Sequence, residues 1–415
     1  MPAPTESTRH MLASTVPNWK SFVQWEKALL EDAFRVSPEV DAVARRLLSG
    51  RETALAKVEE IHRYTMEEIQ YEQDYENHIA GVKPHPAPVV VERGYGDCKD
   101  KAVLFITLAR KAGIDVHFAL VRTRRLGAVR KSVPMQQFNH AIVYVPAQEG
   151  IPVGRFFDPT ADALDIDALR DDDPGTLSLV YDPRGDKHVW REIPYQGADV
   201  HAAYTEVKLK LSTDGSAKGT ARILNQGESG AMVRKLARNA EQFAQVVQGV
   251  TALMFPGATV TAHSVEEVTD LTVPAAFRAE FEVKLVARRE GDDLRLQLPL
   301  GWSPKRVFQL VDRRFPVVLG VPRTQAWRLT VELPEGATVK RLPSTVRVDS
   351  GCIALDRVIQ EVDGTVVLEQ QVTTACERIP VDQYTAQRAK GDEMLRVLGE
   401  ELVLVAPLPP VAPQP

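Results

Sequence analysis

The chain has 415 residues, enough for two or three domains with buried cores. Hydrophobic residues make up 44% and charged residues 26%, which excludes a disordered or fibrous protein. The 51 basic and 56 acidic residues give a net charge of −5, without a long basic run, and this balance disfavours nucleic acid or an anionic membrane as a partner. No run of 18 apolar residues occurs, and the opening residues lack the apolar core of a signal peptide, so no transmembrane or export segment is predicted.

The N-terminal part of the chain has the pattern of packed helices. Residues 1–15 are rich in Pro, Ser and Thr and are expected to form a flexible arm. Residues 19–70 predict three amphipathic helices, of which the middle one has Ser37 as its N-cap and Pro38 in its first turn. Residues 98–112 are apolar almost all round, which predicts a central helix rather than a peripheral one.

Short strands follow this central helix. We predict them at 117–123, 139–146 and 154–159, where β-branched and aromatic residues cluster. Helices followed by consecutive strands indicate an α+β domain, which we assign to residues 16–195.

The second half of the chain alternates apolar and polar residues. Such alternation predicts half-buried antiparallel strands, and recurrent turn signals such as Asp363-Gly364 divide them. We therefore predict a β-sandwich domain at 200–405, with a helical insertion near 229–254. Residues 406–415 are expected to form a Pro-rich tail.

Cys98 occupies a position that suits a nucleophile. It follows a loop that ends in Asp97, the expected N-cap, and Asp100 completes the pattern of a capping box. A thiol in the first turn of a helix faces the positive end of the helix dipole, which favours the thiolate. The alternative interpretation is a small buried cysteine of the core.

His140 and Asp158 supply the base and the orienting acid that a cysteine nucleophile needs. The midpoint of their positions is 149, inside the expected loop at Glu149-Gly150. If the strands on either side form a hairpin about this loop, the two side chains lie opposite each other on one face, about 5 Å apart. A slip of one residue would turn one of them to the other face.

The sequence around these residues resembles the bacterial transglutaminase-like family. The resemblance rests on KPHPA at 83–87, RGYGDCKDKA at 93–102, FNH at 138–140 and FDPT at 157–160. It implies a papain-like fold over residues 16–195 in which Cys98 is the nucleophile, His140 the base and Asp158 the orienting acid. It leaves the reaction open, because the family scaffold serves transglutaminases, peptidases, amidases and inactive members.

The downstream half is similar to the β-rich domain that follows this module in one subgroup of the family. Members of that subgroup usually carry a further β-sandwich ahead of the module, and no such domain precedes it here. We therefore expect either a piece of a longer, exported or periplasmic protein or a shortened, cytoplasmic relative.

Five further residues are candidates for substrate binding or for support of the site, namely His85, Tyr95, Gly96, Asp97 and Asn139. His85 either lines the cleft or is an ordinary loop histidine, and Asn139 either orients His140 or simply begins a strand. The backbone N–H of Cys98 is a candidate oxyanion donor, while a second donor is not identified.

No metal or other cofactor is required by this chemistry. The run Asp171-Asp172-Asp173 lacks the ligand spacing of a calcium loop, and we expect a solvated turn there.

Cys352 and Cys376 flank the turn at Asp363-Gly364 but are one residue out of register for a two-residue loop. A bulge or a three-residue loop would make them cross-strand neighbours able to form a disulfide, and the alternative is two free thiols.

We conclude from the sequence that the protein performs cysteine-dependent acyl transfer on a peptide or protein carboxamide. With water as the second substrate it would be a protease or amidase, and with an amine it would be a protein cross-linker. The alternative is a catalytically silent peptide-binding or scaffold module. The partner of the β-rich domain is left open.

Overall fold

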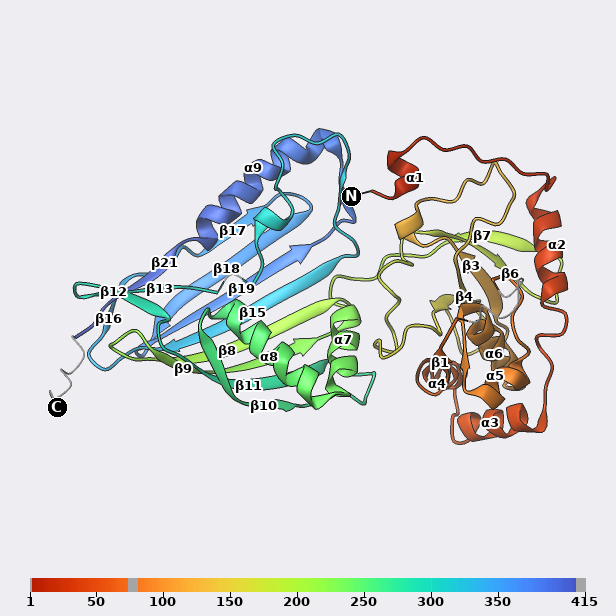
Figure 1. The fold of residues 1–415 in the computed structure, drawn as a ribbon, viewed down its shortest axis with the longest axis horizontal. Coiled ribbons are helices and arrows are strands. Elements are labelled where there is room, and N and C mark those ends of the chain that lie inside the picture. The colour runs from red at the N-terminus through yellow and green to blue at the C-terminus, as the bar shows by residue number, and fades with distance from the viewer. Residues whose placement is uncertain (1, 74–80, 300, 408–415) are drawn as a thin grey trace. The chain divides into compact units, whose positions relative to one another are not determined.

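The computed structural model describes residues 2–73, 81–299 and 301–407, an α+β chain that divides into two compact units. The first unit comprises Pro2–Tyr195 and the second begins at Gln196. Helices pack on one face of a small sheet in the first unit, whereas long strands dominate the second (Figure 1). No helix among the described residues has both the length and the apolar character needed to cross a membrane.

The N-terminal segment, expected to be a flexible arm, is held against the first unit. It contains a short helix, α1 (Pro4–Ser7). The Thr5 hydroxyl donates a hydrogen bond to the Leu126 carbonyl at 2.7 Å, and the Ser14 hydroxyl donates to the carbonyl of Pro134. Both hydrogen bonds join a side chain of this segment to a distant backbone carbonyl. The composition of the segment does not predict such contacts.

The predicted helices between residues 19 and 70 are present in the first unit. They are α2 (Trp19–Leu29), α3 (Pro38–Leu48) and α4 (Ala54–Glu67). Two further helices follow in the chain, α5 (Ala87–Arg93) and the central α6 (Cys98–Lys111). The Ser37 side chain accepts a hydrogen bond from the Val40 amide and so caps α3. Helix α6 is buried continuously from Lys99 to Ala109, as expected of a helix that is apolar nearly all round.

A five-stranded antiparallel sheet packs against α6. Its order is β5-β4-β3-β6-β7, with β3 (His117–Val121), β4 (His140–Val145), β5 (Arg155–Phe157), β6 (Leu177–Tyr181) and β7 (His188–Glu192). Strand β1 (Gln70–Tyr71) pairs in parallel with β2 (Tyr95–Gly96), and β2 directly precedes α6. The remaining regular segment is the short 3₁₀ helix η1 (Arg124–Leu126).

The register of the β4–β5 hairpin differs from the predicted one by two residues. Val143 pairs with Phe157, so His140 and Asp158 are diagonal neighbours rather than direct partners. A shift of two residues preserves the face on which each side chain lies, because side chains alternate with period two. The side chains therefore still meet, although Asp158 lies just beyond the end of β5.

The second unit is built on an eight-stranded sheet with the order β10-β11-β9-β8-β15-β19-β18-β17. A four-stranded sheet, β12-β13-β21-β16, and a two-stranded sheet, β14-β20, accompany it. The strands of the large sheet are β8 (Ala202–Leu211), β9 (Ala217–Asn225), β10 (Ala258–Val265), β11 (Ala275–Val283), β15 (Arg323–Glu332), β17 (Val346–Asp349), β18 (Ile353–Val362) and β19 (Thr365–Thr374). The strands of the small sheets are β12 (Ala287–Glu290), β13 (Asp293–Gln297), β14 (Val317–Val318), β16 (Thr338–Arg341), β20 (Arg378–Ile379) and β21 (Glu401–Val405).

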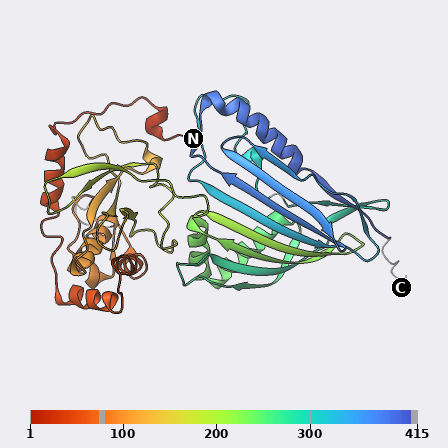
Figure 2. The same cartoon turned by 180° about the vertical axis from the view of Figure 1, so that it is seen from behind.

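The predicted β-rich C-terminal region is present, but helices as well as a second sheet cover its large sheet. One face of the large sheet packs against α7 (Gly227–Ala237), α8 (Ala240–Met254), α9 (Val381–Leu398) and the four-stranded sheet. Helices α7 and α8 lie in front of the strands in Figure 1 and behind them in Figure 2. On the other face, side chains such as Lys208 are exposed.

Two local features of the second unit also differ from prediction. Strands β8 and β15 pair in parallel, because the helices and strands between them return the chain to the same end of the sheet. The helical insertion is two helices, since Asn239 caps α8 through hydrogen bonds from Glu241 and Gln242. The second unit also contains a short 3₁₀ helix, η2 (Pro304–Arg306).

Cys352 and Cys376 form a disulfide, with their Cα atoms 5.2 Å apart. The β18–β19 hairpin keeps a two-residue turn, and its last paired residues are Ile353 and Thr374. Both cysteines lie just beyond that final pair, where the ladder no longer fixes the register. Neither a bulge nor a three-residue loop is therefore needed to bring them together.

Candidate active site

The N-terminus of α6 presents Cys98 in a fixed position. The Asp97 carboxylate accepts a hydrogen bond from the Asp100 amide, and the Asp100 carboxylate accepts one from the Asp97 amide, which is the predicted capping box. Cys98 is the first residue of the helix, is partly buried and carries a free thiol. Lys99 forms an ion pair with Asp97, whose pKa is nonetheless raised by burial and by the charge of Asp100.

Three of the predicted supporting residues lie around this capping box. The His85 amide donates to Asp100 at 2.8 Å, and His85 Nδ1 lies 3.2 Å from the second oxygen of that carboxylate. A Cβ atom on Gly96 would lie 2.7 Å from the Asp100 Cβ, so this position requires glycine. The Tyr95 ring is covered by the Arg93 guanidinium, 5.8 Å from the ring centre.

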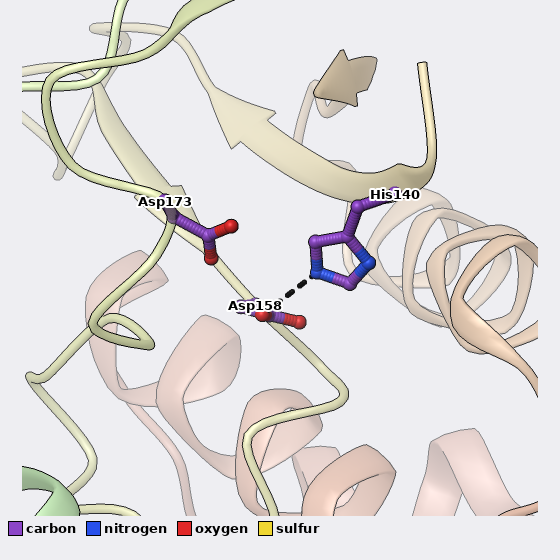
Figure 3. Close-up of side chains that lie close together, drawn as sticks. All are labelled: His140, Asp158 and Asp173. Carbon is purple, nitrogen blue, oxygen red and sulfur yellow. Dashed lines mark hydrogen bonds and ion pairs between the residues drawn. The ribbon is translucent and has the colours of Figure 1, made fainter. Parts of the chain in front are cut away.

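His140 and Asp158 form a buried pair, with His140 Nε2 2.9 Å from Asp158 Oδ2 (Figure 3). The other carboxylate oxygen of Asp158 accepts hydrogen bonds from the Thr160 amide at 2.8 Å and the Thr160 hydroxyl at 2.7 Å. Arg170 Nε lies 3.8 Å from Asp158 Oδ2. Asp158 is thus held as a carboxylate by partners on both of its oxygens.

The pKa values of this pair shift in opposite directions. Burial acts to lower the pKa of His140, but the charge and hydrogen bond of Asp158 and a hydrogen bond to Cys98 raise it well above its usual value. Burial acts to raise the pKa of Asp158, but His140, Arg170 and Thr160 hold it well below its usual value. The arrangement favours an imidazolium beside the Asp158 carboxylate, the state that His140 reaches when it takes the proton of the Cys98 thiol.

Asn139, the remaining supporting candidate, does not contact His140 through its side-chain hydrogen bonds. Its side-chain oxygen accepts a hydrogen bond from the Thr123 amide at 2.9 Å, and its amide nitrogen donates to the Thr123 hydroxyl at 3.1 Å. Asn139 therefore joins the end of β3 to the start of β4, and it positions His140 only through the backbone.

His62 on α4 is a site-supporting residue that the sequence did not indicate. Its Nε2 lies 3.0 Å from the backbone carbonyl of Asp158, and burial lowers its pKa to about 4. A neutral imidazole can donate one hydrogen bond to that carbonyl. In the sequence His62 is only one position on an amphipathic helix, so no local signal marks it.

Tyr71 on β1 is a second residue that was missed. Its pKa is raised by burial and by the nearby charges of Cys98 and Asp97, so it lies on the thiol side of the site. It reaches this place through the pairing of β1 with β2, which precedes α6 directly. A two-residue strand carries too little pattern to be predicted.

A family model of the transglutaminase-like superfamily matches residues 41–199. These residues are a transglutaminase-like domain. A second model, a domain of unknown function with a solved structure (DUF3858), matches residues 295–404, within the second unit. No curated protein matches the chain.

Among solved structures, a putative protease from Parabacteroides distasonis shares the fold, with a TM-score of 0.54 and 12% sequence identity. The match covers 94% of this chain and 59% of that protein, so this chain spans less than two thirds of its length. An M1 zinc metallopeptidase from Deinococcus radiodurans, 12% identical over 52% of this chain and 44% of that protein, reaches a TM-score of only 0.19.

The aspartate run of the transglutaminase-like domain is not the solvated turn that we expected. Asp172 is buried and lies 3.2 Å from the Arg170 guanidinium, and Asp173 is fully buried. His140, Asp158 and Asp173 have potential ligand atoms within 4.8 Å of one another, an arrangement that could hold a metal ion. The guanidinium of Arg170 already supplies positive charge beside Asp158 and would repel such an ion.

Proposed function

We propose that the transglutaminase-like domain is a cysteine-dependent acyltransferase that acts on a peptide or protein carboxamide. The observation that carries the proposal is the buried His140–Asp158 pair within reach of Cys98, which lies at the capped start of α6. This combination matches a nucleophile, a base and a group that orients the base.

In the proposed first half-reaction, His140 accepts the thiol proton of Cys98 and the sulfur attacks the carboxamide carbon. The tetrahedral intermediate places negative charge on the former carbonyl oxygen, which the first-turn amide of Cys98 is placed to stabilise. The C–N bond then breaks, and the proton on His140 passes to the departing amine. A thioester on Cys98 remains.

In the second half-reaction, water or an amine attacks the thioester carbon. His140 takes a proton from the attacking group, and the C–S bond breaks to restore Cys98. Water yields a carboxylic acid, as in a protease or amidase, while an amine yields a new amide, as in a cross-linker. Asp158 keeps the imidazole in one orientation throughout both steps.

The test is alkylation of the native protein with iodoacetamide at about pH 6, followed by peptide mapping. An ordinary thiol with a pKa near 8.5 hardly reacts there. We expect Cys98 to be labelled at least about tenfold faster than in the His140→Ala variant, and Asp158→Asn to fall between the two. Equal labelling of Cys98 with and without His140 would refute the proposal.

A second measurement distinguishes the two acyl acceptors. Hydrolysis of a peptide library and incorporation of a fluorescent primary amine into a glutamine-containing protein are followed in parallel. Cys98→Ala, which removes one sulfur atom, serves as the matched control. Loss of either reaction in this variant supports the proposal, whereas no turnover by the unaltered protein in either assay favours a silent peptide-binding module.

A further inference from the structure

Asp173 is a buried acid that the proposed mechanism does not use. Its side chain is fully buried, and neither carboxyl oxygen has a hydrogen-bond partner among the described residues. Figure 3 shows its carboxyl group directed toward the Asp158–His140 pair. The potential ligand atoms of these three side chains all lie within 4.8 Å of one another.

Two carboxyl groups at this separation, shielded from water, are strongly disfavoured when both are ionised. Asp158 has the partners that stabilise a negative charge, namely the His140 imidazole, two donors from Thr160 and the nearby Arg170. Asp173 has no such donor. A proton shared between the two carboxyl groups therefore resides on Asp173.

We propose that Asp173 is a positioning residue that carries this proton in the resting site. Asp158 then faces His140 as the single carboxylate. When Asp173 ionises at alkaline pH, its negative charge holds His140 as an imidazolium. The groups that act on Asp173 agree with this assignment. Burial and the charges of Asp158 and Asp172 raise its pKa, against the opposing effect of His140 and Arg170, and the net direction is upward.

The consequence for the reaction concerns the second half-reaction, in which His140 must be neutral to accept a proton. A second negative charge beside the imidazolium makes its proton harder to remove. Ionisation of Asp173 therefore keeps His140 protonated and unable to act as a base. Protonation of Asp173 lets His140 become neutral, as the second half-reaction requires. This part of the inference rests on the proposed function.

The first experiment measures the proton directly and needs no activity. Infrared difference spectra between the unaltered protein and Asp173→Asn, recorded near pH 7, are expected to contain the carbonyl stretch of a protonated carboxylic acid. Asp172→Asn is the matched control, because Asp172 is buried but paired with Arg170. The protonated fraction of Glu26, whose pKa is about 7, is common to both proteins and cancels in the difference. Absence of a protonated-acid band from the difference spectrum would overturn the assignment.

The second experiment measures the pH dependence of Cys98 alkylation. Near pH 6, Asp173→Asn should label within about threefold of the unaltered protein, because a neutral amide replaces a neutral acid. At alkaline pH, the further rise in rate that follows loss of the imidazolium proton should move about one unit lower in this variant. A purely structural role would change the rate without moving this inflection.

The outcomes separate the two proposals. If Cys98 of the unaltered protein shows no dependence on His140, the proposed function fails, while the infrared result still decides where the proton resides. If Cys98 is activated but Asp173→Asn leaves the alkaline inflection in place, or slows labelling near pH 6 as far as His140→Ala does, the role of Asp173 is refuted.

Discussion

His62 and Asp158 are 96 residues apart in the chain, yet His62 Nε2 lies 3.0 Å from the backbone carbonyl of Asp158. This contact joins α4 to the segment that follows β5 and holds the backbone of Asp158, the orienting acid of the candidate site, in place. It also packs the His62 ring against the rings of Phe105 and Phe157, with centroid separations of 6.2 and 5.2 Å.

We expect His62→Phe to retain the fold but weaken the site. Phenylalanine fills the same space beside the aromatic rings but cannot donate to the Asp158 carbonyl, which keeps only its hydrogen bond from the Ala161 amide at 3.2 Å. Loss of one such hydrogen bond costs about 0.5–1.5 kcal/mol. The rate of Cys98 alkylation at about pH 6 should fall at least severalfold. His117→Phe is the control, because His117 bonds to Asp115 in the same unit, and equal effects of the two substitutions would contradict this prediction.

Gly96→Ala should disturb the start of α6. The new Cβ would lie 2.7 Å from the Asp100 Cβ, so the capping carboxylate must move, at a cost of about 1–3 kcal/mol in stability. Thermal unfolding and Cys98 alkylation measure the two effects. Gly81→Ala is the matched control, since nothing lies within 4 Å of its Cβ position. An unchanged melting temperature in Gly96→Ala would disprove the prediction.

Glu26 makes stability depend on pH. Burial in α2 raises its pKa from 4.5 to about 7, so the folded protein holds a proton that the unfolded chain has released between these values. Unfolding free energy should therefore fall as pH rises from about 4.5 to 7, by about 3 kcal/mol in total.

Glu26→Gln removes this dependence and tests it. The variant should melt higher than the unaltered protein at pH 8, and the difference should vanish near pH 4. Glu31→Gln, at an exposed position close in sequence, is expected to change neither. A melting difference for Glu26→Gln that is the same at both pH values would show that the charge of Glu26 is not the cause.

The disulfide between Cys352 and Cys376 should stabilise the second unit. It closes a loop with a sequence separation of 24, for which loop closure predicts about 3 kcal/mol. The Cys352→Ser, Cys376→Ser double variant should therefore unfold at a lower denaturant concentration. Ellman titration of the denatured, non-reduced protein should count one thiol, that of Cys98, and a count of three would exclude the bridge.

Part of this structure follows from the sequence because it depends on neighbouring residues. The Ser37 cap, the capping box of Asp97 and Asp100, and the fully buried α6 are encoded within a few positions of the chain. The shared face of His140 and Asp158 also follows, because side-chain alternation survives a two-residue error in register.

Other features required the tertiary structure. The run of three aspartates that ends at Asp173 predicts a solvated turn. Asp173 is buried because its loop packs against the His140–Asp158 pair. The contact of His62 with Asp158 and the parallel pairing of β8 with β15 likewise join segments far apart in sequence. The sequence alone determined which residue types stand at helix starts and on strand faces, because those choices obey local periodicity. The tertiary structure decided which of those residues meet, and which lose contact with water, because such contacts depend on how distant segments pack.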